Sequence, residues 1–136
     1  MAGNVIVDAG FLVSFLGRRD SHHDWAVMQG RTNLPTWHTC EAVLSEAFHL
    51  MSEQARVGLR TLLRRKALIV SFDLRNDLEP VVKLLEKYSG VPMSLADACL
   101  VRMTEVLPEP IILSTDSDFR IYRRHSRQVV PCVLPP

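Results

Sequence analysis

The sequence predicts an α/β fold in which helices wrap a mainly parallel β-sheet. Short apolar runs alternate along the chain with segments of helical apolar spacing, an order typical of strands joined by helical crossovers. Two of these runs, at residues 4–7 and 111–113, are followed by acidic residues, as expected for strands that end at the ligand-binding edge of an open sheet. At 136 residues the chain is long enough for a proper core, and we expect a single domain over 1–136.

Composition narrows the class of protein. Hydrophobic residues make up 47% and charged residues 23%, which is typical of a globular protein rather than a disordered one. The formal net charge of +1 gives no overall electrostatic attraction to nucleic acid or to a membrane. Any electrostatic binding must therefore come from a local cluster of charged residues. The three cysteines are too far apart for a zinc motif or a disulfide framework, and no apolar run reaches the length of a membrane span. We therefore expect a cytoplasmic protein with no membrane partner.

The first half of the chain is expected to be mainly helical. Asn-Val-Ile-Val at 4–7 is an apolar, β-branched run typical of a buried strand, and a largely apolar helix follows it. Thr39 is a candidate N-cap for a strong later helix, and the next helix has leucines on one side and arginines on the other. The expected elements are a strand at 4–7, helices at 9–16 and 20–30, a connection or strand at 31–35, and helices at 39–51 and 53–66.

The second half continues the alternation. Pro80 lies early enough in its helix to be tolerated near the first turn, and Ser94 is a plausible N-cap for a helix that is apolar nearly all round. An arginine-rich segment precedes the last apolar run. The expected elements are a strand at 67–71, helices at 74–88 and from 95 onward, a strand at 111–113, a short helix at 119–125 and a strand at 129–133.

Four acidic residues stand out against their surroundings. Asp8 and Asp116 follow strands, so their carboxylates meet if those strands are neighbours. Asp97 is the only ionisable residue in the run 95–101, and Glu46 has apolar neighbours that predict a largely buried helix and therefore a cation partner. A helix N-cap for Asp8 and a surface ion pair for Glu46 are the simpler interpretations of these two residues.

Carboxylates gathered in one pocket repel one another and do not stay ionised without a cation. A site made of oxygen ligands alone favours a hard ion, Mg²⁺ or Mn²⁺, held together with water and substrate phosphate. Such a site suits hydrolysis of phosphodiester bonds, because the ion activates water, polarises the phosphate and neutralises the leaving oxygen.

These residues give the sequence a resemblance to the PIN domain family, and within it to the VapC-like toxin ribonucleases of bacterial toxin–antitoxin systems. The similarity extends over essentially the whole chain, in the right order and spacing. It is carried by Val-Ile-Val-Asp8, Asp20-Ser-His-His23, Thr39-Cys-Glu-Ala-Val-Leu-Ser-Glu46, Leu95-Ala-Asp97-Ala and Leu113-Ser-Thr-Asp116-Ser-Asp118-Phe119.

The resemblance implies a three-layer α/β/α sandwich, a ribonuclease that depends on a divalent metal, a homodimer and a small antitoxin partner. The four core acids of the family correspond to Asp8, Glu46, Asp97 and Asp116, and Asp118 to a less constant fifth. Two departures are visible. Ala9 and Gly10 stand where many relatives have a small hydroxyl residue, and Ser94 stands where many have an Asp.

We assign roles to the site residues on this basis. Asp8, Asp97 and Asp116 are expected to bind the metal, with Asp118 as an additional ligand, whereas Glu46 binds or orients water as an outer ligand of the metal. Thr115 is expected to support the site through its hydroxyl group or to act as a cap. Five arginines are candidates for contact with RNA phosphates: Arg18, Arg19, Arg120, Arg123 and Arg124.

Three alternative functions remain at this stage. A nuclease that acts on DNA would have nearly the same sequence features. A non-catalytic module that binds RNA or protein would keep the fold and the acids for stability or docking. A phosphoryl-accepting receiver is disfavoured, because the sequence lacks the acidic pair after the first strand and the later lysine that such proteins need.

Overall fold

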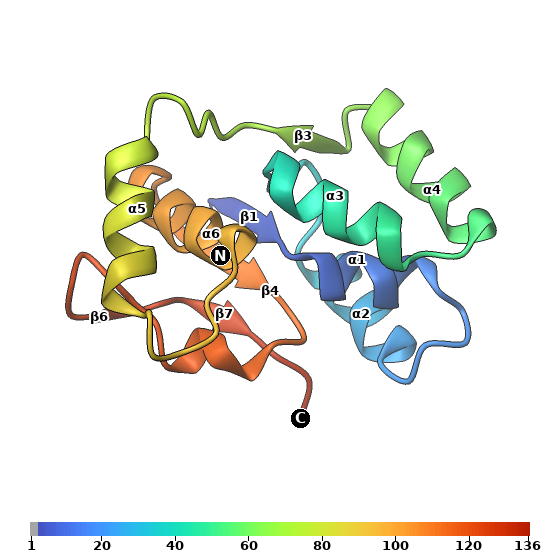
Figure 1. The fold of residues 1–136 in the computed structure, drawn as a ribbon. Coiled ribbons are helices and arrows are strands. Elements are labelled where there is room, and N and C mark those ends of the chain that lie inside the picture. Colours follow the sequence, from blue (N-terminus) through green and yellow to red (C-terminus); the bar gives the residue numbers. More distant parts are fainter. Residues whose placement is uncertain (1–2) are drawn as a thin grey trace.

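The structure, a computed structural model, describes residues 3–136 and contains a five-stranded parallel sheet flanked by helices (Figure 1). The strands lie in the order β3-β2-β1-β4-β7. Their bounds are Asn4–Val7 for β1, Trp37–Thr39 for β2, Leu68–Val70 for β3, Pro110–Leu113 for β4 and Cys132–Val133 for β7. The predicted α/β class is confirmed, and every strand pair within this sheet is parallel.

Six α-helices connect the strands within residues 3–136. Pro80 is the third residue of its helix, where the missing N–H leaves no helical hydrogen bond unmade. No helix within residues 3–136 is long and apolar enough to cross a membrane. The helices are α1 (Ala9–Leu16), α2 (His23–Thr32), α3 (Glu41–Leu50), α4 (Glu53–Arg64), α5 (Leu78–Lys87) and α6 (Leu95–Val106).

The central strand β1 determines where a site can form. Residues 5–7 are all buried, as expected for a strand covered on both faces. From β1 the chain passes through α1 and α2 to β2, and then through α3 and α4 to β3, always away from β4. It returns through α5 and α6 to β4, on the other side of β1. The strand order therefore reverses between β1 and β4, the point where open α/β sheets bind ligands.

The position of strand β2 differs from the prediction. A connection or strand was expected at 31–35 and a helix from Thr39, but α2 continues to Thr32 and β2 contains Thr39. Trp37 and Thr39 are both buried, and Thr39 donates a hydrogen bond to the Val7 carbonyl over 3.1 Å. Thr39 is thus a sheet residue, and the N-cap position of α3 falls to Cys40.

The arginine-rich segment after β4 also differs from the prediction. A short 3₁₀ helix, η1 (Ser117–Arg120), replaces the start of the expected helix at 119–125. The rest forms a hairpin of β5 (Arg123–Arg124) and β6 (Gln128–Val129), with positive φ angles at His125 and Ser126 in its turn. The expected strand at 129–133 is divided at Pro131, which has no N–H to donate, so that β6 and β7 belong to different sheets.

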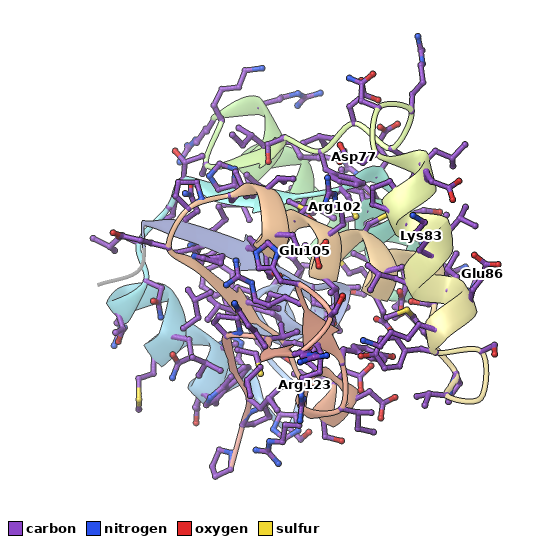
Figure 2. All side chains as sticks on the ribbon, turned by 90° about the vertical axis from the view of Figure 1, so that its left-hand side faces the viewer. Asp77, Lys83, Glu86, Arg102, Glu105 and Arg123 are labelled. Carbon is purple, nitrogen blue, oxygen red and sulfur yellow. The ribbon has the colours of Figure 1, made fainter. Side chains whose placement is uncertain are left out.

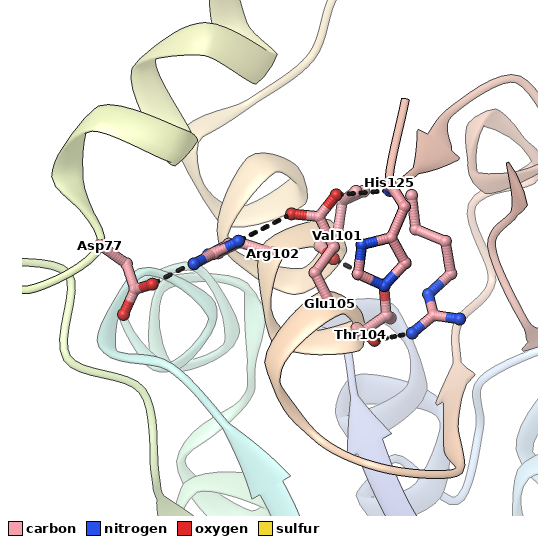
Figure 3. A network of polar contacts seen from close by, with 7 residues as sticks. Asp77, Val101, Arg102, Thr104, Glu105 and His125 are labelled. Carbon is pink, nitrogen blue, oxygen red and sulfur yellow. Dashed lines mark hydrogen bonds and ion pairs between the residues drawn. The ribbon is translucent and has the colours of Figure 1, made fainter. Parts of the chain in front are cut away.

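A chain of polar contacts fixes this hairpin to the helices (Figure 3). Asp77, Arg102 and Glu105, which belong to it, are labelled among all the side chains in Figure 2. Arg102 on α6 donates to Asp77 over 2.8 Å and to Glu105 over 3.2 Å. The other oxygen of Glu105 accepts a hydrogen bond from the backbone N–H of His125 over 2.7 Å. Arg124 donates to the carbonyl of Thr104, also on α6. The hairpin is therefore held against α6, the helix that carries Asp97.

Candidate active site

The carboxyl ends of β1 and β4 are joined by a serine hydroxyl. Val7 pairs with Leu113, so the residues that follow these strands lie side by side. Ser114 donates to the Asp8 carboxylate over 2.7 Å, and its hydroxyl oxygen accepts a hydrogen bond from the backbone N–H of Asp116 over 2.9 Å. The two acids predicted to meet at this edge are therefore linked through one buried side chain, which the sequence analysis did not single out.

Asp8 is a buried acid that also caps a helix. It is 6% exposed, and one of its oxygens accepts a hydrogen bond from the backbone N–H of Ala9 at the start of α1 over 2.7 Å. Burial raises the pKa of Asp8 from its usual 3.8 to about 6, and the hydrogen bonds from Ser114 and Ala9 oppose this rise. The negative charges of Asp97 and Glu46 raise the pKa further. The N-cap interpretation and the site interpretation are therefore both compatible with its position.

Asp97 approaches the same edge from α6. Its side chain and that of Ser94 form a capping box, in which each accepts a hydrogen bond from the backbone N–H of the other. Burial raises its pKa, the hydrogen bonds from Ser94 and Tyr122 lower it, and the charge of Asp116 raises it. Ser94, noted as a departure from the family pattern, thus orients the carboxylate of Asp97.

A buried tyrosine completes the surroundings of Asp97. The Tyr122 hydroxyl donates to Asp97 over 2.9 Å, and its ring lies between those of Tyr88 and Phe119, with centroids 5.2 and 5.5 Å away. Burial raises the pKa of Tyr122, and the charges of Asp97, Asp118 and Asp116 raise it as well. Sequence analysis missed this residue, because an aromatic residue in an arginine-rich segment gives no sign that it faces an acid.

Asp116 and its neighbours form the start of η1. Asp116 accepts a hydrogen bond from the backbone N–H of Asp118 over 2.9 Å and is the N-cap of this helix. The adjacent Thr115 packs so closely on Gly10 that a Cβ atom at residue 10 would collide with its hydroxyl oxygen. Gly10, the other departure from the family pattern, therefore allows a close contact between α1 and Thr115, whose side chain would have to move for any other residue at position 10.

Glu46 differs from its expected environment. It lies on the exposed side of α3, whereas Val43 and Ala47 form the buried side, so the prediction of a largely buried carboxylate is wrong. The helical spacing of these two residues turns Glu46 away from the core. Its negative charge nevertheless raises the pKa of Asp8.

The chemistry of these acids suits a divalent cation. Within residues 3–136, every ion pair lies elsewhere, joining Arg56 and Arg60 to Glu53 and Arg102 to Asp77 and Glu105. In the same part of the chain, no three His, Cys, Asp or Glu side chains are already placed to hold a metal ion. Mg²⁺ is commonly bound through only one or two carboxylates, with water and substrate phosphate as the other ligands. The donor set therefore fits such an ion by charge and by ligand type.

The five candidate arginines fall into two groups. Arg18 and Arg19 are exposed after α1 and line a cavity of about 920 Å³ between the ends of α1 and α3. Arg120 is exposed as well. Arg123 and Arg124 are half-buried. Arg123 donates to the backbone carbonyl groups of residues 120–122, and Arg124 donates to the carbonyl group of Thr104 and to the side chain of Gln128. Their guanidinium groups already have structural partners, which makes them weaker candidates for phosphate contact.

Comparison of the sequence with models of protein families places most of the chain in one of them. The model of a protein family described as PIN domain matches residues 5–124, which include Asp8, Glu46, Asp97, Asp116 and the hairpin strand β5. No curated protein sequence matches the chain.

Proposed function

The chain belongs to the PIN domain family, and from this premise we propose that it is a metal-dependent endoribonuclease of the VapC-like toxin type. Members of the family are generally nucleases that use divalent metals. The observation that supports the proposal most is the link from Asp8 through the Ser114 hydroxyl to Asp116, beside an Asp97 whose charge raises the pKa of Asp8. None of these acids forms an ion pair within residues 3–136.

Each acid has a distinct role in the proposed reaction. Asp8, Asp97 and Asp116 would hold the cation, Mg²⁺ or Mn²⁺, with Asp118 nearby as a further ligand. When bound, that cation polarises the scissile phosphate and lowers the pKa of the attacking water. Ser114, Tyr122 and the capping box keep the carboxylates in place. Exposed Glu46 orients the water and accepts its proton.

Cleavage of a mixed RNA pool by the purified protein tests this proposal. We expect cleavage with Mg²⁺ or Mn²⁺, none with EDTA, and a loss of at least about 10³-fold in the Asp97→Asn variant. An Asn oxygen can still accept the hydrogen bonds of Ser94 and Tyr122, so this variant should fold normally. Asp24→Asn, on the exposed surface of α2, is the matched control and should cleave as the wild type does.

The outcome also separates the alternatives. Equal cleavage of matched DNA and RNA oligonucleotides would contradict the ribonuclease assignment in favour of a broader nuclease. Absence of cleavage with every metal, together with unchanged RNA binding by Asp97→Asn, would support a non-catalytic module. The antitoxin partner and the homodimer stay predictions, and copurification with a small protein encoded beside this chain would test the former.

We further propose that Arg18 and Arg19 bind phosphates of the RNA strand away from the cut. They follow the C-terminal end of α1, whereas Asp8 caps its N-terminal end, so about 12 Å of helix separates them from the acids. The adjoining cavity has apolar walls of Phe15 and Leu16 against which a base can pack. The arginines would therefore hold a nucleotide beyond the one that is cleaved.

Replacing both arginines by Ala should raise KM about tenfold and leave kcat nearly unchanged, because phosphate contacts of this kind bind substrate and transition state equally. The slope of log KM against the logarithm of the salt concentration should also decrease, by the amount expected for the loss of about two phosphate contacts. Arg65→Ala, at the opposite end of α4 from this cavity, is the control. A fall in kcat with KM unchanged would contradict a binding role.

A further inference from the structure

A second chemically distinctive group lies beside the acids, at the contact between α3 and α6. Cys40 is the N-cap residue of α3 and Cys99 lies in the second turn of α6, and these helices pack together. Both thiols are 2% exposed, and neither is in a disulfide. The mechanism proposed above uses neither residue.

The Cys40 sulfur lies in surroundings that favour a negative charge. Hydrogen bonding with the Cys99 thiol lowers the pKa of Cys40, and the backbone N–H groups of Val43 and Ala42 lower it further, whereas burial and the negative charge of Asp8 raise it. These N–H groups are the free donors at the start of α3, where the helix presents its positive end. A helix N-terminus that stabilises the thiolate is one feature of cysteines that react with oxidants.

Both thiols line the same cavity. Its volume is about 460 Å³, and its walls include Phe72, Leu74 and Leu95, with Arg75 at the exposed rim. A small neutral oxidant has room to enter this cavity and meet the sulfur atoms. Cys132, by contrast, is half-buried near the C-terminal end and does not line this cavity.

We propose that Cys40 and Cys99 form a redox-active pair that hydrogen peroxide converts to a disulfide. The Cys40 sulfur attacks one peroxide oxygen, the O–O bond breaks, and the departing hydroxide takes up the thiol proton to leave as water. The Cys99 sulfur then attacks the sulfur of the resulting sulfenic acid, the S–O bond breaks, and a second water leaves with the Cys99 proton. Two thiols are oxidised and one peroxide is reduced.

The disulfide joins the start of α3, which carries Glu46, to α6 two residues after Asp97. Moving these helices together changes the spacing of the acids, and a displacement of about 1 Å lowers cleavage by up to about 10²-fold. This consequence rests on the proposed nuclease function, whereas formation of the disulfide does not.

Peptide mass spectrometry of the folded protein tests the pair directly. After treatment with hydrogen peroxide, the wild type should yield a linked Cys40–Cys99 peptide that lacks two hydrogen atoms and that dithiothreitol separates. The control variant Cys132→Ser should yield the same product. In Cys99→Ser, oxidation should stop at a Cys40 sulfenic acid, which dimedone captures.

Two results would overturn the inference. One is that Cys40 and Cys99 remain reduced in the folded protein under conditions that fully oxidise glutathione. The other is that the only disulfide joins Cys132 of two chains. Cleavage by the reduced protein is scored separately: a linked peptide without any cleavage would refute the nuclease proposal alone, and cleavage without a linked peptide would refute the redox proposal alone.

Discussion

Replacing Asp8 by Asn is expected to abolish RNA cleavage and, at about pH 8, to make the folded protein more stable. Asp8 is 6% exposed and has a pKa of about 6 in the folded protein against 3.8 when unfolded. Above pH 6 the folded state therefore bears the cost of a buried charge, about 3 kcal/mol at most. An Asn oxygen can still accept from Ala9 N–H, and its amide group can donate to the Ser114 hydroxyl oxygen.

The pH dependence gives the sign of this effect. As pH falls through 6, folded Asp8 takes up a proton before the unfolded chain does, so its unfavourable contribution fades and is absent below the unfolded pKa of 3.8. The stability difference between variant and wild type, measured by urea unfolding, should be largest near pH 8 and close to zero near pH 4. A variant that is less stable than the wild type at pH 8 would contradict an uncompensated charge at Asp8.

Metal binding supplies a readout that does not require activity. A cation beside the ionised acids stabilises the folded state by mass action, so Mg²⁺ should raise the melting temperature of the wild type at about pH 8. The Asp8→Asn variant should show a much smaller rise. Glu79→Gln, at the exposed start of α5, is the control and should respond as the wild type does. Equal responses of all three proteins would argue against Asp8 as a ligand.

Replacing Trp37 by Ala is expected to cause the largest loss of stability, about 3–5 kcal/mol. Trp37 is 1% exposed, and its ring meets those of Phe11 and Phe15 edge to face, with centroids 5.3 and 5.1 Å away. Its indole N–H donates to the carbonyl of Asn33 over 2.7 Å. The substitution leaves a large cavity between β2 and α1 and removes this hydrogen bond. Because domains of this size are stable by about 5–15 kcal/mol, the loss is severe.

Urea unfolding followed by tryptophan fluorescence measures the effect, since the chain has two tryptophans and the variant retains Trp25. Trp25→Ala is the matched control. This residue is half-buried and packs on the Phe11 ring at 6.1 Å, so its removal should cost clearly less. A cost below about 1 kcal/mol for Trp37→Ala would mean that the aromatic cluster does not anchor β2.

The sequence was most informative where the residues of a segment are compatible with only one kind of structural environment. The apolar runs at 4–7 and 111–113 indicated buried strands, and the acids that follow them were recognisable as partners on the condition that these strands are neighbours. The structure supplies that condition, because β1 pairs with β4. Asp97 was recognisable for a similar reason, because it is the only ionisable residue in the apolar run 95–101, where a carboxylate needs a special environment.

The failures have a common physical origin in contacts between distant parts of the chain. Thr39 suits a helix cap as well as a strand, and only its hydrogen bond to Val7 decides between them. The arginines at 123 and 124 have good helical propensity, but their bonds to carbonyl groups and the positive φ angles of the turn produce a hairpin. The prediction for Glu46 relied on its apolar neighbours in the sequence, whereas in α3 Glu46 lies on a different face from the buried residues Val43 and Ala47.

The capping roles of three acids have a consequence for how such a protein changes over evolutionary time. Asp8 and Asp116 start helices, and Asp97 closes a capping box, so selection for folding favours an acid or its amide at all three positions even if no RNA is cut. Glu46 lies exposed in the middle of α3, where many residues are compatible with the helix. In related proteins that have lost catalytic activity, Glu46 should therefore be the first of the four acids to be replaced by genetic drift.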